Sequence, residues 1–218
     1  MKFVRARWAM AAELTVVGII VCYGSFSVVS LVLLLLLGSQ SLWSRGLGWS
    51  DLGLRRPVAP WRTILYAVAA SVGLLFAIRI VIVPLAVFVA GDSIDLSVFG
   101  EAGDTRAFLP WFVEALTLSA FGEEMVFRGY LIRRVSELMG NTSVGRVAAV
   151  VVSSALFGLA HRYQGRAGVI ATAMIGAVQG TLYLCDRENL WTVIVCHGIV
   201  DAVILSTLYF DHRSVLFP

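Results

Sequence analysis

Long runs of apolar residues without any charge dominate the pattern along this chain. The first run, residues 14–37, holds 24 residues and contains no Asp, Glu, Lys or Arg. At about 1.5 Å per residue, a helix of this length is roughly 36 Å long, enough to cross the ~30 Å hydrocarbon core of a membrane with some tilt. The run is too long for the apolar part of a secretory signal peptide. It therefore predicts a first membrane span that stays attached to the chain.

Five more apolar runs follow, at about residues 63–90, 107–127, 147–161, 167–184 and 190–210. A linker rich in Gly and Pro, residues 38–61, separates the first two runs, and an acidic loop, residues 91–106, separates the next two. In the fifth run, Gly176 and Gly180 have the spacing that lets two helices approach closely. The pattern predicts an all-α fold, a polytopic helical membrane bundle of about six transmembrane helices.

The composition agrees with a membrane protein and excludes several other classes. Hydrophobic residues make up 59% of the chain and charged residues 14%, about half of the ~25% that is typical of soluble domains. The net charge of +3 is small and scattered, so no nucleic-acid surface is expected. We expect an integral, multi-pass protein of the plasma (cell) membrane, with the lipid bilayer as its surroundings.

The distribution of basic residues does not settle the orientation in the membrane. With six spans, the loops on one side carry eight Lys and Arg residues and those on the other side carry seven, whereas cytoplasmic loops normally show a clear excess. The short stretch that contains Arg133, Arg134 and Arg146 is uniformly basic. This favours placing that stretch in the cytoplasm.

The ionisable residues inside the apolar runs are the first candidates for chemistry, because a charge in the membrane is costly. Arg79 lies near the middle of the second run, and most of the others lie in the second half of the chain. In a helix, Glu124 and Arg128 share a face and can pair, while Glu123 points about 100° away. One acid is then neutralised and the other is left for chemistry. The alternative is a charged cluster at a helix end that reaches towards the membrane surface.

Two further pairs have the same four-residue spacing on later runs. Phe157 and His161 form one pair, and His197 and Asp201 form the other. Each histidine by itself is more often a satisfied polar group than a catalyst, but three runs together could surround one water molecule. The sequence contains no HExxH zinc motif, no GxSxG serine motif, no GxGD motif and no P-loop. The arrangement is that of a hydrolase.

The ordered set of Glu123-Glu124-x-x-x-Arg128, Phe157-x-x-x-His161 and His197-x-x-x-Asp201 resembles the CPBP (Abi) family. These are intramembrane proteases related to the type II CAAX prenyl endopeptidase. The resemblance covers about residues 108–206. It implies a protease core at residues 108–210, preceded by N-terminal transmembrane helices and a linker at residues 1–107.

The resemblance also implies roles for the site residues. Glu123 would be the general base, acting on a water shared with His161, and His197 with the residue at 201 would stabilise the developing oxyanion. Glu124 and Arg128 would hold the helices in place, with Phe157 completing the motif. The substrate would be a membrane peptide or a lipidated protein, processed in a CAAX-type reaction or as a small peptide.

The residue at 201 departs from the prenyl endopeptidases, which usually carry Asn there. An ionised Asp201 cannot donate a hydrogen bond to an oxyanion, so it must be protonated, orient His197 or contact a metal. His161 and His197 with the carboxylates could also supply a zinc site with three protein ligands. We favour a site without a metal and keep zinc as the alternative.

A non-enzymatic function is the second hypothesis. The same buried acids could serve an immunity or scaffold protein that binds a peptide in the membrane, or a carrier of ions or protons. Loss of cleavage in Glu123→Ala and His161→Ala variants would support the enzyme, whereas a cellular effect that survives Glu123→Ala and His197→Ala would support binding. Flux that is abolished by Glu124→Gln would support transport.

Overall fold

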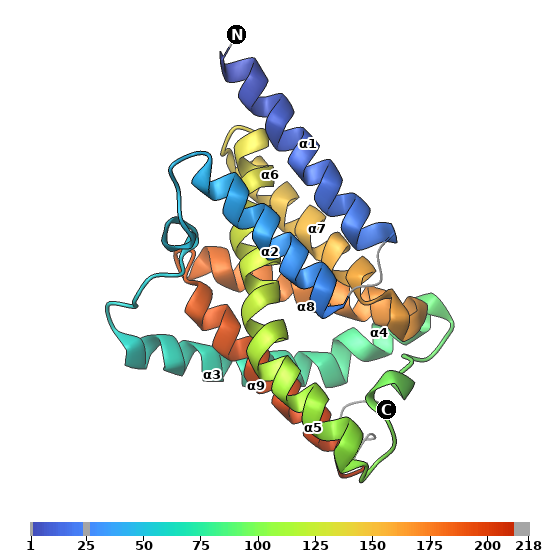
Figure 1. Ribbon diagram of the computed structural model, residues 1–218. Helices are drawn as coiled ribbons and strands as arrows, with labels where there is room; N and C mark the ends of the chain where they lie inside the picture. Colours follow the sequence, from blue (N-terminus) through green and yellow to red (C-terminus); the bar gives the residue numbers. More distant parts are fainter. Residues whose placement is uncertain (1, 24–26, 212–218) are drawn as a thin grey trace.

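The computed structural model describes residues 2–23 and 27–211 and shows helices without any strand over that part of the chain (Figure 1). The elements in chain order are α1 (Lys2–Tyr23), α2 (Val28–Trp43), η1 (Trp49–Leu52), α3 (Pro60–Ala77), η2 (Ile78–Ile82), α4 (Val83–Ala90), η3 (Ser97–Phe99), α5 (Thr105–Glu114), η4 (Ala115–Leu131), α6 (Ile132–Leu138), α7 (Ser143–Ala160), η5 (Arg162–Gln164), α8 (Gly165–Cys185) and α9 (Leu190–Tyr209). The predicted all-α membrane fold is confirmed.

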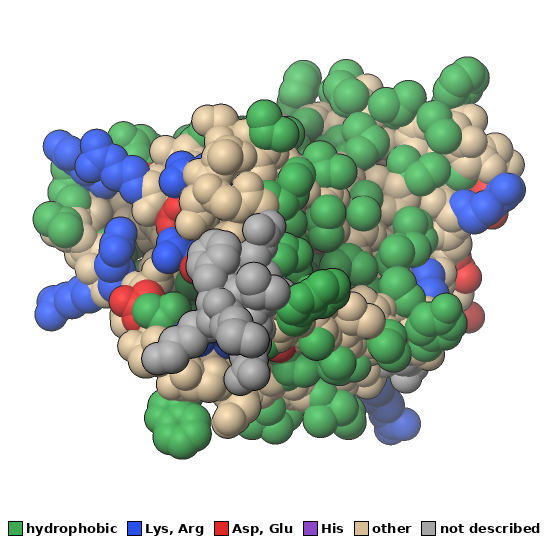
Figure 2. Space-filling model, turned by 90° about the horizontal axis from the view of Figure 1, so that it is seen from above, with side chains coloured by type: hydrophobic (Ala, Val, Ile, Leu, Met, Phe, Trp, Pro, Cys, Tyr) green, Lys and Arg blue, Asp and Glu red, His purple; other side chains and the backbone are tan. Residues whose placement is uncertain are grey.

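Four helical segments are long and apolar enough to cross a membrane, counted over the described residues. They are Pro60–Ala90, Ser143–Ala160, Arg162–Cys185 and Leu190–Tyr209. They correspond to the second, fourth, fifth and sixth predicted runs. Large apolar side chains such as Phe76 and Phe88 are exposed on them, and Figure 2 shows a broad hydrophobic area between charged side chains at its edges. This is the surface expected of a protein that faces lipid.

The predicted first span, residues 14–37, is wrong as a single helix. The apolar run divides into α1 and α2, which lie side by side and run in opposite directions (Figure 1). Ser27 caps α2, because its side chain accepts a hydrogen bond from the backbone N–H of Ser30. Both helices are apolar, so the hydropathy of the sequence does not reveal that one helix ends and another begins within this run. The linker accordingly begins after Trp43 rather than at residue 38.

The third predicted span also differs, because α5, η4 and α6 join into one helix from Thr105 to Leu138. Residues 123–128 therefore lie in the middle of this helix, and Arg133 and Arg134 belong to it rather than to a loop. The alternative of a charged cluster at a helix end is thus wrong. In η4 the turns are wide, with hydrogen bonds of the i to i+5 type, a form that often occurs at functional sites.

The long helix lies at the centre of the bundle, where it packs against α2, α7 and α9. Ser153 on α7 donates a hydrogen bond of 2.6 Å to the backbone oxygen of Phe127. Helices α7 and α8 pack closely, as the Gly176 and Gly180 spacing predicts. A Cβ at Gly176 would lie 3.2 Å from the Phe157 ring, and one at Gly180 would lie 3.2 Å from Val150. This packing brings α7, α8 and α9 around η4.

Candidate active site

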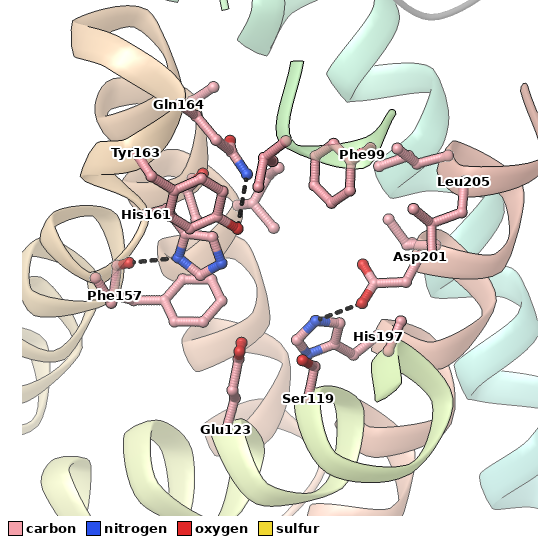
Figure 3. Close-up of a pocket in the computed structure, with 18 of the residues that line it drawn as sticks. Phe99, Ser119, Glu123, Phe157, His161, Tyr163, Gln164, His197, Asp201 and Leu205 are labelled. Carbon is pink, nitrogen blue, oxygen red and sulfur yellow. Dashed lines mark hydrogen bonds and ion pairs between the residues drawn. The ribbon is translucent and has the colours of Figure 1, made fainter. Parts of the chain in front are cut away.

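Three helices bring the predicted site residues together in the bundle core. Glu123, Glu124 and Arg128 lie on η4, Phe157 and His161 lie at the end of α7, and His197 and Asp201 lie on α9. Figure 3 shows that Glu123, His161 and His197 border one common space. The three motifs therefore converge at a single place, although Glu123 and His161 are 38 positions apart in the sequence and His161 and His197 are 36 positions apart.

Glu124 and Arg128 form the predicted ion pair, buried in the centre of the bundle. Arg128 Nη1 lies 2.9 Å from Glu124 Oε1, and the two side chains are 1% and 0% exposed. Arg128 Nη2 donates to Gln179 Oε1 on α8 at 2.6 Å, and its guanidinium lies 4.2 Å from the centre of the Phe157 ring. Arg128 thereby contacts side chains on α7 and α8 as well as its own helix.

His197 lies between two carboxylates. Its Nδ1 is 2.8 Å from Glu124 Oε1, and its Nε2 is 3.2 Å from Asp201 Oδ2. A ring that donates a hydrogen bond at both nitrogens carries a positive charge. Glu124 thus contacts both Arg128 and His197, and the four side chains from Arg128 to Asp201 form one connected network between η4 and α9.

His161 is held by the backbone of its own helix. Its Nδ1 lies 2.9 Å from the backbone oxygen of Phe157, four residues earlier, and the two rings are in contact, with centroids 4.8 Å apart. A carbonyl oxygen can only accept a hydrogen bond. Nδ1 must therefore carry the proton, and Nε2 carries the lone pair when the ring is neutral.

Glu123 lies at the cavity that these residues border. It is 4% exposed, and its Oε2 is buried without a hydrogen-bond partner among the described residues. Buried carboxylate oxygens are normally hydrogen-bonded, and an exception points to a functional role or to a bound water molecule. Glu124 Oε2 is buried in the same way, but Glu124 Oε1 contacts Arg128 and His197, so Glu123 differs from its neighbour in lining the cavity without an ion-pair partner among the described residues.

The cavity has a volume of about 670 Å³ and is mostly apolar. Glu123, His161, His197 and Asp201 all line it, and so do apolar side chains of η3, α8 and α9. Its outer part reaches the loop after α4 and the segment 162–164. The arrangement is an apolar chamber with a few polar groups, as in many small-molecule and peptide sites.

Several residues of the site were not predicted from the sequence. Gln179 is buried and hydrogen-bonds to Arg128, while Ser119, Tyr163 and Gln164 line the cavity. Gln179 could have been found as a neutral polar residue within an apolar run. Ser119 lies four residues before Glu123 and could have been found by its helical spacing.

The residues of the site do not fit a zinc ion. Both nitrogens of His197 face carboxylate oxygens at 2.8 and 3.2 Å, so neither has a lone pair directed at a metal. Among the described residues, no group of three or more His, Cys, Asp and Glu side chains is arranged to hold a metal ion. The ligand arrangement required for a catalytic zinc, three protein ligands and one open position, is not formed by these side chains.

Comparison with known proteins finds a family model that matches part of the chain. Residues 105–203 match the family model described as type II CAAX prenyl endopeptidase Rce1-like. No curated protein and no solved structure matches the chain. The matched residues include all three motifs and most of the cavity wall. Over residues 105–203, which are 99 of the 218 residues, the chain therefore resembles the type II CAAX prenyl endopeptidases described as Rce1-like.

Proposed function

We propose that this protein is an intramembrane endopeptidase in which Glu123 and His161 activate a water molecule. The observation that carries the proposal is the buried, unpartnered Oε2 of Glu123 at the cavity that His161 also lines. The match of residues 105–203 to the type II CAAX prenyl endopeptidase model supports a CAAX-type protease that acts in the membrane. The accepting Nε2 of His161 and the carboxylate of Glu123 are two groups that can bind the hydrogens of one water.

In the proposed reaction, Glu123 removes a proton from the water as the oxygen attacks the carbonyl carbon of the scissile peptide bond. The product of this step is a tetrahedral intermediate with a negatively charged oxygen. Glu123 then transfers the proton to the leaving nitrogen, and the C–N bond breaks. A positioned base of this kind contributes roughly 10²–10⁴-fold to the rate.

We assign His197 as the donor to the developing oxyanion, with its Nε2–H turning from Asp201 to the oxyanion when the substrate binds, while Glu124 Oε1, 2.8 Å from Nδ1, orients the ring. The contact of 3.2 Å between His197 Nε2 and Asp201 Oδ2 is the longer of the two contacts of the ring, which supports Nε2–H as the donor that is released, and Asp201 holds this N–H until the substrate is bound. With Glu124 and Asp201 negative and Arg128 and His197 positive, the network has no net charge. A donor held in place in this way lies in a water-poor site, where it stabilises charge more strongly than in water.

The cavity supports a substrate with an apolar part. Its walls include Ile175, Val200 and Leu205, which could contact either a hydrophobic peptide segment or a lipid chain attached to a protein. We propose that the substrate is a membrane peptide or a lipidated protein, cleaved close to the part that lies in the bilayer.

The test of the site uses the purified protein in lipid vesicles with membrane peptides and prenylated peptides, and mass spectrometry to detect new peptide ends. We expect His161→Ala to lower the cleavage rate by roughly 10²-fold or more, because the water loses one of its two partners. Imidazole added to this variant should restore part of the rate. A zinc chelator should leave the wild-type rate unchanged. Undiminished cleavage by His161→Ala would show that His161 is not in the site.

We further propose an orientation in the cell membrane. Because α1 and α2 form a hairpin, the N-terminus lies at the same end of the bundle as the linker and the α6–α7 and α8–α9 connections (Figure 1). Over the residues that the structure describes, eleven basic residues then lie at that end and three at the other. The eleven are Lys2, Arg5, Arg7, Arg45, Arg55, Arg56, Arg62, Arg133, Arg134, Arg146 and Arg187, and the three are Arg106, Arg162 and Arg166.

This excess supports a cytoplasmic location for the basic end. The catalytic cavity is lined by residues of the loop after α4 and by segment 162–164, which belong to the opposite end. With the basic end in the cytoplasm, the substrate reaches the catalytic cavity from the outer side of the membrane. Its scissile segment must therefore be exposed on that side.

Labelling of single cysteines tests the orientation independently of any activity. In a variant without the three native cysteines, Ser50→Cys probes the basic end and Asp92→Cys probes the opposite end; both positions are exposed. With a maleimide that does not cross membranes, we expect labelling at 92 in intact cells and at 50 after permeabilisation only. The reverse pattern would place the catalytic cavity on the cytoplasmic side.

A further inference from the structure

A second cavity lies at the basic end of the bundle, away from the catalytic residues. It has a volume of about 700 Å³, and its walls come from the linker, the first turns of α3, the end of α8 and the α8–α9 loop. The two cavities share no lining residue. Four arginines line the second one, and we call it the arginine cavity: Arg55, Arg56, Arg62 and Arg187.

The positive charge of the arginine cavity is not balanced by the protein. The ion pairs that the described residues form include none of the four arginines. One acid, Asp186, also lines the cavity. Its Oδ2 already accepts hydrogen bonds from Thr192 Oγ1 at 2.5 Å and Asn189 Nδ2 at 3.1 Å. The cavity is thus lined by four guanidinium groups and by one carboxylate, whose Oδ2 is already hydrogen-bonded within the protein.

The backbone around the arginine cavity is fixed by contacts between distant segments. Tyr183 on α8 donates to the backbone oxygen of Leu52 at 2.8 Å, and the N–H of Leu190 donates to the backbone oxygen of Gly53 at 3.3 Å. Gly53 has φ 96°, and a Cβ there would lie 1.7 Å from the backbone oxygen of Glu188. The linker is therefore packed on the α8–α9 loop, which sets the arginines of both segments around one space.

The place of the cavity points to the kind of ligand. It lies where the candidate spans Pro60–Ala90 and Leu190–Tyr209 begin and where Arg162–Cys185 ends, which is the level of the lipid headgroups. Tyr66 lines it, and the guanidinium of Arg62 lies 5.1 Å from the Trp61 ring; aromatic side chains are common at this level. The anion present there in bulk is phosphate, which the guanidinium fork binds through paired hydrogen bonds.

We propose that the arginine cavity binds the phosphate of an anionic membrane lipid such as phosphatidylglycerol. A lipid with net negative charge matches the excess positive charge of the cavity, whereas a zwitterionic lipid does not. The cytoplasmic leaflet is rich in anionic lipids, in agreement with the orientation proposed above. The site concerns lipid binding and does not depend on the proposed peptide cleavage.

Native mass spectrometry of the full chain in detergent tests this site with phosphatidylglycerol, phosphatidylcholine and inorganic phosphate as probes. We expect the wild-type protein to retain phosphatidylglycerol in preference to phosphatidylcholine. The variant Arg55→Gln/Arg187→Gln should bind it roughly tenfold or more weakly, because each arginine near anionic headgroups contributes several-fold. The control is Arg146→Gln/Arg166→Gln, which removes the same charge from exposed positions outside the cavity and should bind as the wild type does.

Size-exclusion profiles and unfolding temperatures without added lipid show whether both variants are folded; a folded cavity variant is expected because the two arginines are exposed. If a variant fails to fold, Arg55→Lys/Arg187→Lys, which keeps the charge but loses the paired hydrogen bonds of the guanidinium, should bind phosphatidylglycerol more weakly than the wild type but more tightly than a variant without the two charges. Equal retention of the two lipids, or equal loss in variant and control, would overturn the proposal. Displacement of phosphatidylglycerol by millimolar inorganic phosphate would assign the cavity to free phosphate and overturn the lipid assignment.

Discussion

Glu123→Gln will lower the rate of peptide cleavage by roughly 10²–10⁴-fold, the contribution of a positioned general base. The amide has almost the same shape as the carboxyl group, but it cannot take a proton from water. Because Glu123 is 4% exposed and has no ion-pair partner among the described residues, the substitution should leave the fold intact. The measurement is the initial rate of cleavage in lipid vesicles, with the unfolding temperature as a check on the fold.

Glu114→Gln is the matched control for this variant. Glu114 lines the same cavity on α5, so its substitution removes a carboxyl group from the same surroundings without touching the proposed base. We expect a much smaller change in rate for this control. Equal losses in both variants would indicate that the charge of the cavity matters and that Glu123 has no special part in the reaction.

The second large effect is expected on stability. Arg128→Gln should lower the free energy of unfolding by about 3–5 kcal/mol, the usual result of removing one partner of a buried ion pair. Glu124 is fully buried and would lose the guanidinium 2.9 Å away, and Gln179 would lose its donor at 2.6 Å. The measurement is reversible unfolding in mixed micelles with increasing amounts of a denaturing detergent.

Arg133→Gln is the control for Arg128→Gln. Arg133 pairs with Glu137 at the same four-residue spacing on the same long helix, at 2.7 Å, but its side chain is 38% exposed. Such pairs contribute about 0–1 kcal/mol. In the double variant Glu124→Gln/Arg128→Gln, part of the loss should be recovered because no unpaired buried charge remains. Equal small losses in both single variants would show that the buried network does not stabilise the bundle.

Contacts within one helix could be predicted from spacing, because residues four apart share a face. The pairs Glu124–Arg128, Phe157–His161 and His197–Asp201 are all in contact in the structure. Four of the six predicted spans were also found at nearly the predicted residues. The apolar pattern and the four-residue spacing were enough for these predictions.

Contacts between helices could not be predicted in this way. The bond between His197 and Glu124 joins residues 73 positions apart, and nothing in the spacing selects Glu124 rather than Glu123 as the partner. The structure separates the two acids: Glu124 contacts Arg128 and His197, whereas Glu123 borders the cavity. The role of Asp201 likewise depends on its distance from the ring of His197.

The sequence by itself determined the helical membrane class, the positions of most spans and the three motifs that resemble those of the CPBP family. These depend on apolar length and on local spacing, both of which are properties of single helices. The tertiary structure decided that the first apolar run is a hairpin, which places eleven basic residues at one end. It also decided that Glu124 is paired and that Glu123 lines the cavity. Both depend on how helices pack against one another, and packing between distant segments leaves no local signal in hydropathy.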